Sequence, residues 1–246
     1  MKKAILPILF VIMISGPLLE LLSGEIYFNL DWQTADRSSA HIAPDPDQVH
    51  EAIVQVYTAR AFNWRGILAV HTWIATKSEN AAEYIVHQKI GWRKWQGLPV
   101  VVSEPDIPDR LWYGVTPEII LDLRGPEAGK AIAGILEAVE TYPYKHQYQM
   151  WPGPNSNTFI AYIYRRVPEM NKDLPTTAIG KDFLPNGGII SSAPSKTGLQ
   201  VSVYGLIGFT VALKEGIELN IFGMTLGIDP IDIAIKLPGI GQIGLK

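Results

Sequence analysis

Apolar and polar residues alternate near the carboxy terminus, and this pattern restricts the fold more than any other. Apolar residues or glycine occupy every second position in 201–213, then in 217–221 and again in 231–235. A period of two residues is that of a β-strand, and the Lys-Glu-Gly segment at 214–216 is typical of a turn. We therefore predict an antiparallel β-meander of about three strands. Such a meander either extends a sheet or offers a surface to lipid or a partner.

Other periodic segments precede the meander. β-rich runs predict strands at 51–60, 67–77, 83–92 and 98–104, with a further strand at 146–151 and an apolar segment of open type at 117–123. Helical spacing predicts helices at 126–142 and from Asn155 to about Val167. The expected fold class is α+β: an antiparallel sheet with the second helix packed against it, followed by the carboxy-terminal β-meander.

The amino terminus has the pattern of a targeting segment. Lys2 and Lys3 precede an uncharged run that Glu20 interrupts and Leu21 and Leu22 extend to about 19 residues. That length is close to the roughly 20 residues that span a bilayer. The lysines before the run and the acidic residues after it predict an amino end inside the inner membrane and a periplasmic or extracytoplasmic body. A signal peptide cleaved near Ser23-Gly24-Glu25 is the alternative.

These segments predict four parts of the chain. They are a membrane anchor or signal at 1–24, a linker or arm at 25–50, an α+β core at 51–170, and a loop-rich segment with the β-meander at 171–246.

Charge and composition exclude several functions. Lys and Arg total 21 against 24 Asp and Glu, which gives a formal net charge of -3 and no basic stripe for nucleic acid. The chain has no cysteine, so disulfides, thiolate ligands and a cysteine nucleophile are excluded. The five histidines have no metal-ligand spacing and no phosphate-binding or dinucleotide motif occurs, so we expect neither a metal nor a cofactor.

The segment "WPGPNSNTF" ends one element and begins the helix at Asn155. Asn155 and Ser156 are both favoured helix caps, which explains the sequence without any chemistry. Ser156 is alternatively a nucleophile, because free backbone N–H groups at a helix start stabilise an oxyanion. His71 in the strand "AVHTWIAT" is then the candidate base.

Other residues are candidates around this pair. If the strands at 67–77 and 83–92 form a hairpin whose paired residue numbers sum to about 158, His87 lies opposite His71 and orients it. A one-residue slip places Gln88 there and turns His87 to the other face. The candidate substrate-binding residues are Trp73, Asn155, Asn157 and Trp151. The tryptophans either line a groove or fill the core, and the basic cluster at Arg65, Lys89, Arg93 and Lys94 is expected to be a solvated strand edge.

A strand with "HTW" followed by a helix start with "NSNTF" resembles the circularly permuted papain-like hydrolases and acyltransferases, the lecithin–retinol acyltransferase and NlpC-type groups. The resemblance implies that Ser156 stands where those enzymes have their cysteine and that His71 is the base. The segments "WRGILAVHTWIATK", "WPGPNSNTF" and "TAIGKDFLP" also resemble an uncharacterised family of bacterial envelope proteins, in which serine belongs to the pattern.

Two functions follow as hypotheses. The first is a membrane-anchored envelope protein that hydrolyses or transfers an amide or ester of a lipid or cell-wall substrate, with Ser156 as nucleophile and His71 as base. The second is a non-catalytic envelope binding or assembly module that keeps the fold. A Ser156 hydroxyl within hydrogen-bond reach of His71 favours the first, and a Ser156 packed at its own helix start favours the second.

Overall fold

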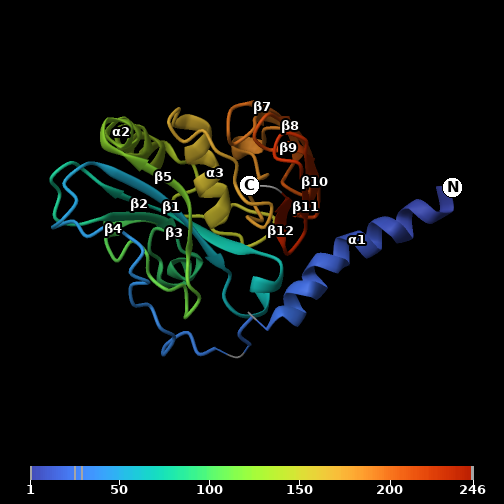
Figure 1. Cartoon of the computed structure of the whole chain (residues 1–246), viewed down its shortest axis with the longest axis horizontal. Helices are drawn as coiled ribbons and strands as arrows, with labels where there is room; N and C mark the ends of the chain where they lie inside the picture. The colour runs from blue at the N-terminus through green and yellow to red at the C-terminus, as the bar shows by residue number, and fades with distance from the viewer. Residues whose placement is uncertain (1, 25, 29, 245–246) are drawn as a thin grey trace.

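The computed structural model describes residues 2–24, 26–28 and 30–244, except for the side chains of residues 2–6, 8 and 9. Two antiparallel sheets, with two helices packed on the first, form its body, and a long amino-terminal helix projects from that body (Figure 1). The α+β fold class predicted from the sequence is confirmed.

The first sheet has the strand order β4-β3-β2-β1-β5, and each neighbouring pair is antiparallel. Its strands are β1 (Ile53–Arg60), β2 (Val70–Lys77), β3 (Ile85–Lys89), β4 (Val101–Pro105) and β5 (Glu118–Arg124). The strands predicted at 51–60, 67–77, 83–92 and 98–104 are therefore confirmed, although each begins two or three residues later than predicted. The apolar segment at 117–123 is a strand.

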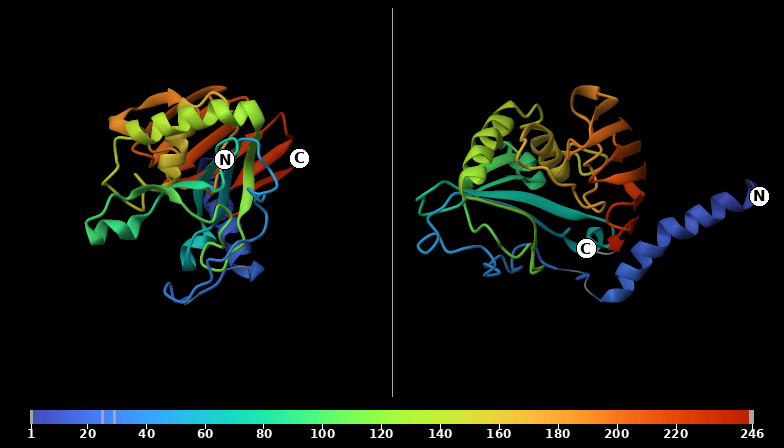
Figure 2. Two further views of the ribbon diagram at one scale, coloured as in Figure 1. Left: turned by 90° about the vertical axis from the view of Figure 1, so that its left-hand side faces the viewer. Right: turned by 45° about the horizontal axis from the view of Figure 1, so that its top comes forward.

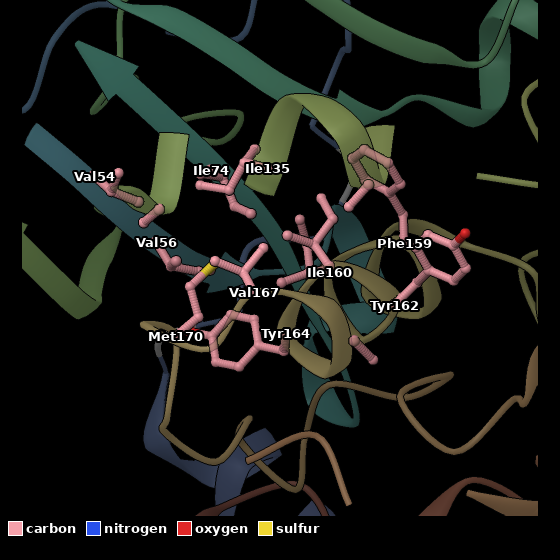
Figure 3. Packing of buried hydrophobic residues seen from close by; sticks show 14 of the residues in the cluster. Val54, Val56, Ile74, Ile135, Phe159, Ile160, Tyr162, Tyr164, Val167 and Met170 are labelled. Carbon is pink, nitrogen blue, oxygen red and sulfur yellow. The ribbon is translucent and has the colours of Figure 1, made fainter. Parts of the chain in front are cut away.

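Helices α2 (Gly125–Thr141) and α3 (Ser156–Arg166) cover one face of this sheet. Val56 and Ile74 of the sheet pack with Ile135 of α2 and Ile160 of α3 in a core of fully buried side chains (Figure 3). Pro126 stands in the first turn of α2, where its missing N–H breaks no helical hydrogen bond. Both predicted helices are confirmed to within two residues.

The opposite face of the first sheet carries a second core that includes Tyr57 and Trp73. The arm before β1 wraps this side of the molecule. Asp109 fastens it, because its carboxylate accepts hydrogen bonds from the backbone N–H groups of Ile42 at 2.7 Å and Ala43 at 3.0 Å. Both faces of the sheet are consequently covered.

The carboxy-terminal sheet follows the chain order from β6 to β12. Its strands are β6 (Ile190–Ser192), β7 (Gly198–Val203), β8 (Ile207–Ala212), β9 (Gly216–Ile221), β10 (Met224–Asp229), β11 (Ala234–Leu237) and β12 (Gly241–Gly244). The predicted meander is present, but the expected number of about three strands is too small. Tight turns at Tyr204-Gly205 and Phe222-Gly223, with positive φ at all four residues, separate β7 from β8 and β9 from β10. The apolar alternation in the sequence continues across these turns, so it does not reveal them.

The strand predicted at 146–151 is wrong. These residues form turns and irregular backbone. The backbone N–H of Gln149 donates to the carbonyl oxygen of Pro154 at 3.0 Å and closes a loop. A Cβ at Gly91 would lie 2.5 Å from the Tyr148 ring, so that ring packs directly against the backbone beyond β3. Packing of a large side chain has therefore replaced strand pairing.

Buried polar groups join the second sheet to the rest of the body. Glu218 on β9 forms ion pairs with Lys181, from the loop after α3, and with Lys236 on β11 at 3.0 Å. All three residues are at most 1% exposed. Burial alone would raise the pKa of Glu218, but the two ammonium groups lower it below its ordinary value. The sheet thus turns a polar face inward, toward α3, which lies beside it in Figure 2.

Helix α1 (Lys2–Ser23) projects from the body and packs against it near its carboxy end. Glu20 forms an ion pair with Arg60 of β1 at 2.7 Å. Within the described residues, no helix has the length and apolar character needed to cross a membrane, so the transmembrane helix expected at 1–24 is not found. The helix carries Pro7, Pro17 and Glu20 within its length. Glu25, used in the orientation and cleavage expectations, lies outside the described residues.

Candidate functional site

The start of α3 is a junction of three segments far apart in the sequence. Asn155 is the helix cap, because its side-chain oxygen accepts from the N–H of Thr158 at 3.0 Å while the Thr158 hydroxyl accepts from the N–H of Asn155 at 3.1 Å. This reciprocal pair satisfies donors that a helix start otherwise leaves free. The Asn155 amide also donates to Ile179 at 2.9 Å, so the "TAIGKDFLP" loop closes over the cap.

Asn157 fixes the same helix start to strand β2. Its side-chain amide donates to the carbonyl oxygens of Val70 at 3.0 Å and Ile179 at 2.8 Å. Its side-chain oxygen accepts from the Thr72 hydroxyl at 2.8 Å. The polar residues around Ser156 therefore have structural partners, and Asn155 and Asn157 are occupied by hydrogen bonds within the chain.

His71 lies on the other face of the sheet. Successive strand residues point to opposite faces, and Thr72 points toward α3 because it contacts Asn157. His71 instead stacks on Trp112, with ring centroids 3.7 Å apart and planes inclined by 7°. Trp73 lies beside it in the second core. The structure therefore does not bring His71 and Ser156 together.

The environment of His71 also makes it a weak base. Burial lowers the pKa of His71 to about 3, and the neighbouring Gln88 side chain only partly opposes this shift. Its Nε2 has no hydrogen-bond partner within the described chain. A general base works best when its pKa lies near the working pH, so this imidazole is poorly suited to take a proton from a hydroxyl.

His87 does not orient His71. Strands β2 and β3 pair Ile74 with His87, so paired residue numbers sum to 161 rather than to the predicted 158. This odd displacement turns His87 to the α3 face, where its ring nitrogens contact the hydroxyls of Thr76 at 2.9 Å and Ser103 at 2.8 Å. Burial lowers the pKa of His87 to about 4. Gln88 instead shares the face of His71, as expected for a one-residue slip from the predicted register.

Ser156 is the first residue of α3 and is 4% exposed. Its hydroxyl makes no hydrogen bond with any residue that the structure describes, whereas Asn155 and Asn157 on either side are fully engaged. The N–H of Thr158 in the first turn already bonds to the Asn155 cap. The backbone N–H of Thr158 is therefore not free to bind an oxyanion, because the Asn155 cap already accepts its hydrogen bond.

The two tryptophans predicted to bind substrate have different surroundings. Trp73 is 1% exposed, stacks on Tyr57 at 5.5 Å and donates from Nε1 to the carbonyl oxygen of Pro108 at 2.7 Å. It fills the core. Trp151 is 45% exposed and donates from Nε1 to the carbonyl oxygen of Phe222 at 2.9 Å, which ties the "WPGP" loop to the second sheet.

Lys89 is a notable residue that the sequence reasoning misjudged. It was expected on a solvated strand edge, but it is 1% exposed and faces α2 and α3. Its ammonium donates to the Tyr142 hydroxyl at 3.1 Å and lies within 6 Å of the ring centroids of Tyr142, Tyr144 and Tyr148. Burial lowers the pKa of Lys89 to about 7. The sequence contains one indication of this burial, the three tyrosines Tyr142, Tyr144 and Tyr148, whose rings surround the Lys89 ammonium.

Surface depressions do not single out the predicted pair. One lies beside Arg60, Phe62 and Trp112, and a more open one lies between the arm and Tyr84. Neither is lined by Ser156 or His71. No cluster of three or more acidic, histidine or cysteine ligands suited to a metal occurs within residues 2–24, 26–28 and 30–244.

These features define an α+β protein in which helix α3 lies between the two sheets. Hydrogen bonds at the start of α3 fix it to strand β2 of the first sheet, and Arg165 near its end bonds to the second sheet. The family described as "Protein of unknown function (DUF3750)" matches residues 51–183, more than half of the chain, and the chain belongs to that family. The match ends just after the Ile179–Asp182 segment that closes the junction. No curated protein and no solved structure matches the chain.

Proposed function

We propose that this chain is a non-catalytic binding or assembly module of the cell envelope. The observation that carries the proposal is the placement of His71 and Ser156 with respect to opposite faces of the first sheet. A nucleophile needs its base within hydrogen-bond reach, and here the base position is filled by an imidazole stacked in a core. The papain-like resemblance extends to the order of strand and helix, but the facing geometry does not support that chemistry.

The envelope location in this proposal rests on the amino-terminal segment. The described side chains of α1 include eight large apolar groups that are at least 38% exposed. Lys2 and Lys3 precede them in the sequence. Exposed apolar groups of this number favour contact with lipid, and lysines beside them favour anionic headgroups.

Fluorophosphonate labelling tests the absence of serine chemistry. We expect purified full-length protein to take up no label that depends on Ser156, because no described group activates its hydroxyl. The measurement compares the unaltered protein with Ser156→Ala and His71→Ala, using a short and a long probe and a known serine hydrolase as positive control. Labelling of the unaltered protein that disappears in both variants would contradict the proposal and restore the hydrolase hypothesis.

A further inference from the structure

The carboxy-terminal sheet exposes an apolar face. Along β7, β8 and β9, every second side chain points outward, and each of these outward side chains from 199 to 219 is apolar and 39–65% exposed. The members are Leu199, Val201, Val203, Ile207, Phe209, Val211, Ile217 and Leu219. Ile228, Ile235 and Ile243 continue the face on β10, β11 and β12. We call this set the outward face.

The alternate side chains of the same strands are polar and buried. Gln200, Thr210 and Glu218 are each at most 2% exposed and point toward α3 and its following loop. The sheet is therefore polar inside and apolar outside, the reverse of an ordinary half-buried sheet. Nothing in the core requires the outward side chains to be apolar, so another contact must explain them.

The outward face is continuous and large. Val201 pairs with Phe209, and Phe209 pairs with Leu219, so their side chains form a row across three strands. With strands about 4.8 Å apart and a rise of about 3.3 Å per residue, β7 to β12 cover roughly 25 by 20 Å. That is on the order of 500 Å² in projection, as large as the largest apolar patches of ordinary monomers.

Helix α1 adjoins this face. It packs against the body through Met13, Gly16 and Glu20, which are buried. A Cβ at Gly16 would lie 2.0 Å from the carbonyl oxygen of Pro238, so the helix touches the turn between β11 and β12. Figures 1 and 2 show α1 rising on the side of the second sheet that faces away from α3. Its exposed apolar side chains are Phe10, Val11, Ile12, Ile14, Leu18, Leu19, Leu21 and Leu22.

We propose that the outward face and α1 together insert their apolar side chains into the hydrocarbon layer of a lipid bilayer, beneath its headgroups. This inference rests on the proposed function and names its partner as a membrane surface. The outward positions of β7, β8 and β9 hold no charged or hydrogen-bonding side chain, whereas protein interfaces carry polar rims and regular hydrogen bonds. Contact with lipid hydrocarbon requires neither a polar rim nor hydrogen bonds.

A second copy of the chain fits these observations less well. Two such sheets packed face to face would cover each outward face, but α1 projects into the space on that side (Figure 1). The exposed side chains of α1 would also stay in water. A bilayer surface covers the sheet and the helix at once, because α1 contacts the turn at Pro238, which joins β11 and β12 of that sheet.

Site-specific labelling distinguishes these partners. The chain has no cysteine, so Phe209→Cys provides a single site for the environment-sensitive fluorophore nitrobenzoxadiazole. The matched control is Leu136→Cys. The Leu136 side chain is 51% exposed, and its helix α2 lies away from α1 (Figure 1). The labelled full-length proteins are compared in detergent-free buffer and with vesicles of phosphatidylethanolamine and phosphatidylglycerol, with and without brominated acyl chains.

We expect the label at position 209 to shift to the blue with vesicles and to be quenched by the brominated chains, while the label at position 136 does neither. Phe209→Lys should lower vesicle affinity about tenfold or more, since burying a phenylalanine contributes about 1.5–3 kcal/mol, and Leu136→Lys should leave it unchanged.

A label at position 209 that stays in water on vesicle-bound protein would overturn the inference. A blue shift without lipid that grows with protein concentration would also overturn it, because the face would then be covered by a second copy. Both results leave the serine-labelling test untouched, so the failure of this inference and that of the proposed function are distinguishable.

Discussion

Glu218→Gln is expected to lower the free energy of unfolding by about 3–5 kcal/mol, because buried Lys181 loses its ion-pair partner and buried Lys236 keeps only Asp173. Lys181 and Lys236 both pair with Glu218, and each is at most 1% exposed. Chemical denaturation at neutral pH measures the loss. Glu104→Gln on β4 is the matched control, since Glu104 is exposed and its change should stay within about 0.5 kcal/mol.

The same substitution has a defined pH dependence. The folded-state pKa of Glu218 is lowered, so its carboxylate stabilises the protein above the unfolded pKa of about 4.5. That contribution is lost as the pH falls through the lower folded pKa. The unaltered protein and Glu218→Gln should therefore differ most at neutral pH and converge in acid. Equal stability at neutral pH would show that the ion pairs do not hold the second sheet in place.

Asn157→Ala is expected to have the second largest effect, a loss of about 3 kcal/mol. It removes three buried hydrogen bonds, to Val70, Ile179 and Thr72, at a cost of about 1 kcal/mol apiece. The Ile179 carbonyl oxygen keeps only its hydrogen bond from the Asn155 amide. Thermal and chemical denaturation report the change.

Ser156→Ala is the control for this substitution, because it alters the adjacent residue. The Ser156 hydroxyl makes no hydrogen bond within the described chain, so its loss should change stability by no more than about 0.5 kcal/mol. If Ser156→Ala were as destabilising as Asn157→Ala, the helix start would depend on Ser156 and the assignment of structural roles here would be wrong.

The elements of the first sheet could be predicted because their residues carry strong local signals. The run at 53–60 is rich in β-branched residues, and Asn155 with Thr158 forms a reciprocal cap that marks the start of α3. The register between β2 and β3 could not be predicted, because the loop between them is long enough to accept several pairings. A shift from 158 to 161 reverses the face of His87.

The candidate site depended on a fact that local sequence does not contain. In β2, Val70 and Ile74 on one face and Trp73 and Ala75 on the other are all apolar and buried. The pattern therefore does not say which face receives α3, or whether His71 shares that face with Ser156. In the second sheet, alternation predicted strands correctly. It could not reveal that the apolar side faces outward, because alternation gives the two faces but not their direction.

The central claim is that no functional pair joins Ser156 to His71, and the ionisation of a single thiol tests it most directly. Ser156→Cys introduces the one cysteine of the chain, and the ultraviolet absorbance of its thiolate reports its pKa. The account predicts the same pKa, within about half a unit, with His71 present or replaced in His71→Phe, which retains a ring against Trp112. A thiol pKa below about 6 that rises by two units or more in His71→Phe would reveal a thiolate–imidazolium pair and contradict the account.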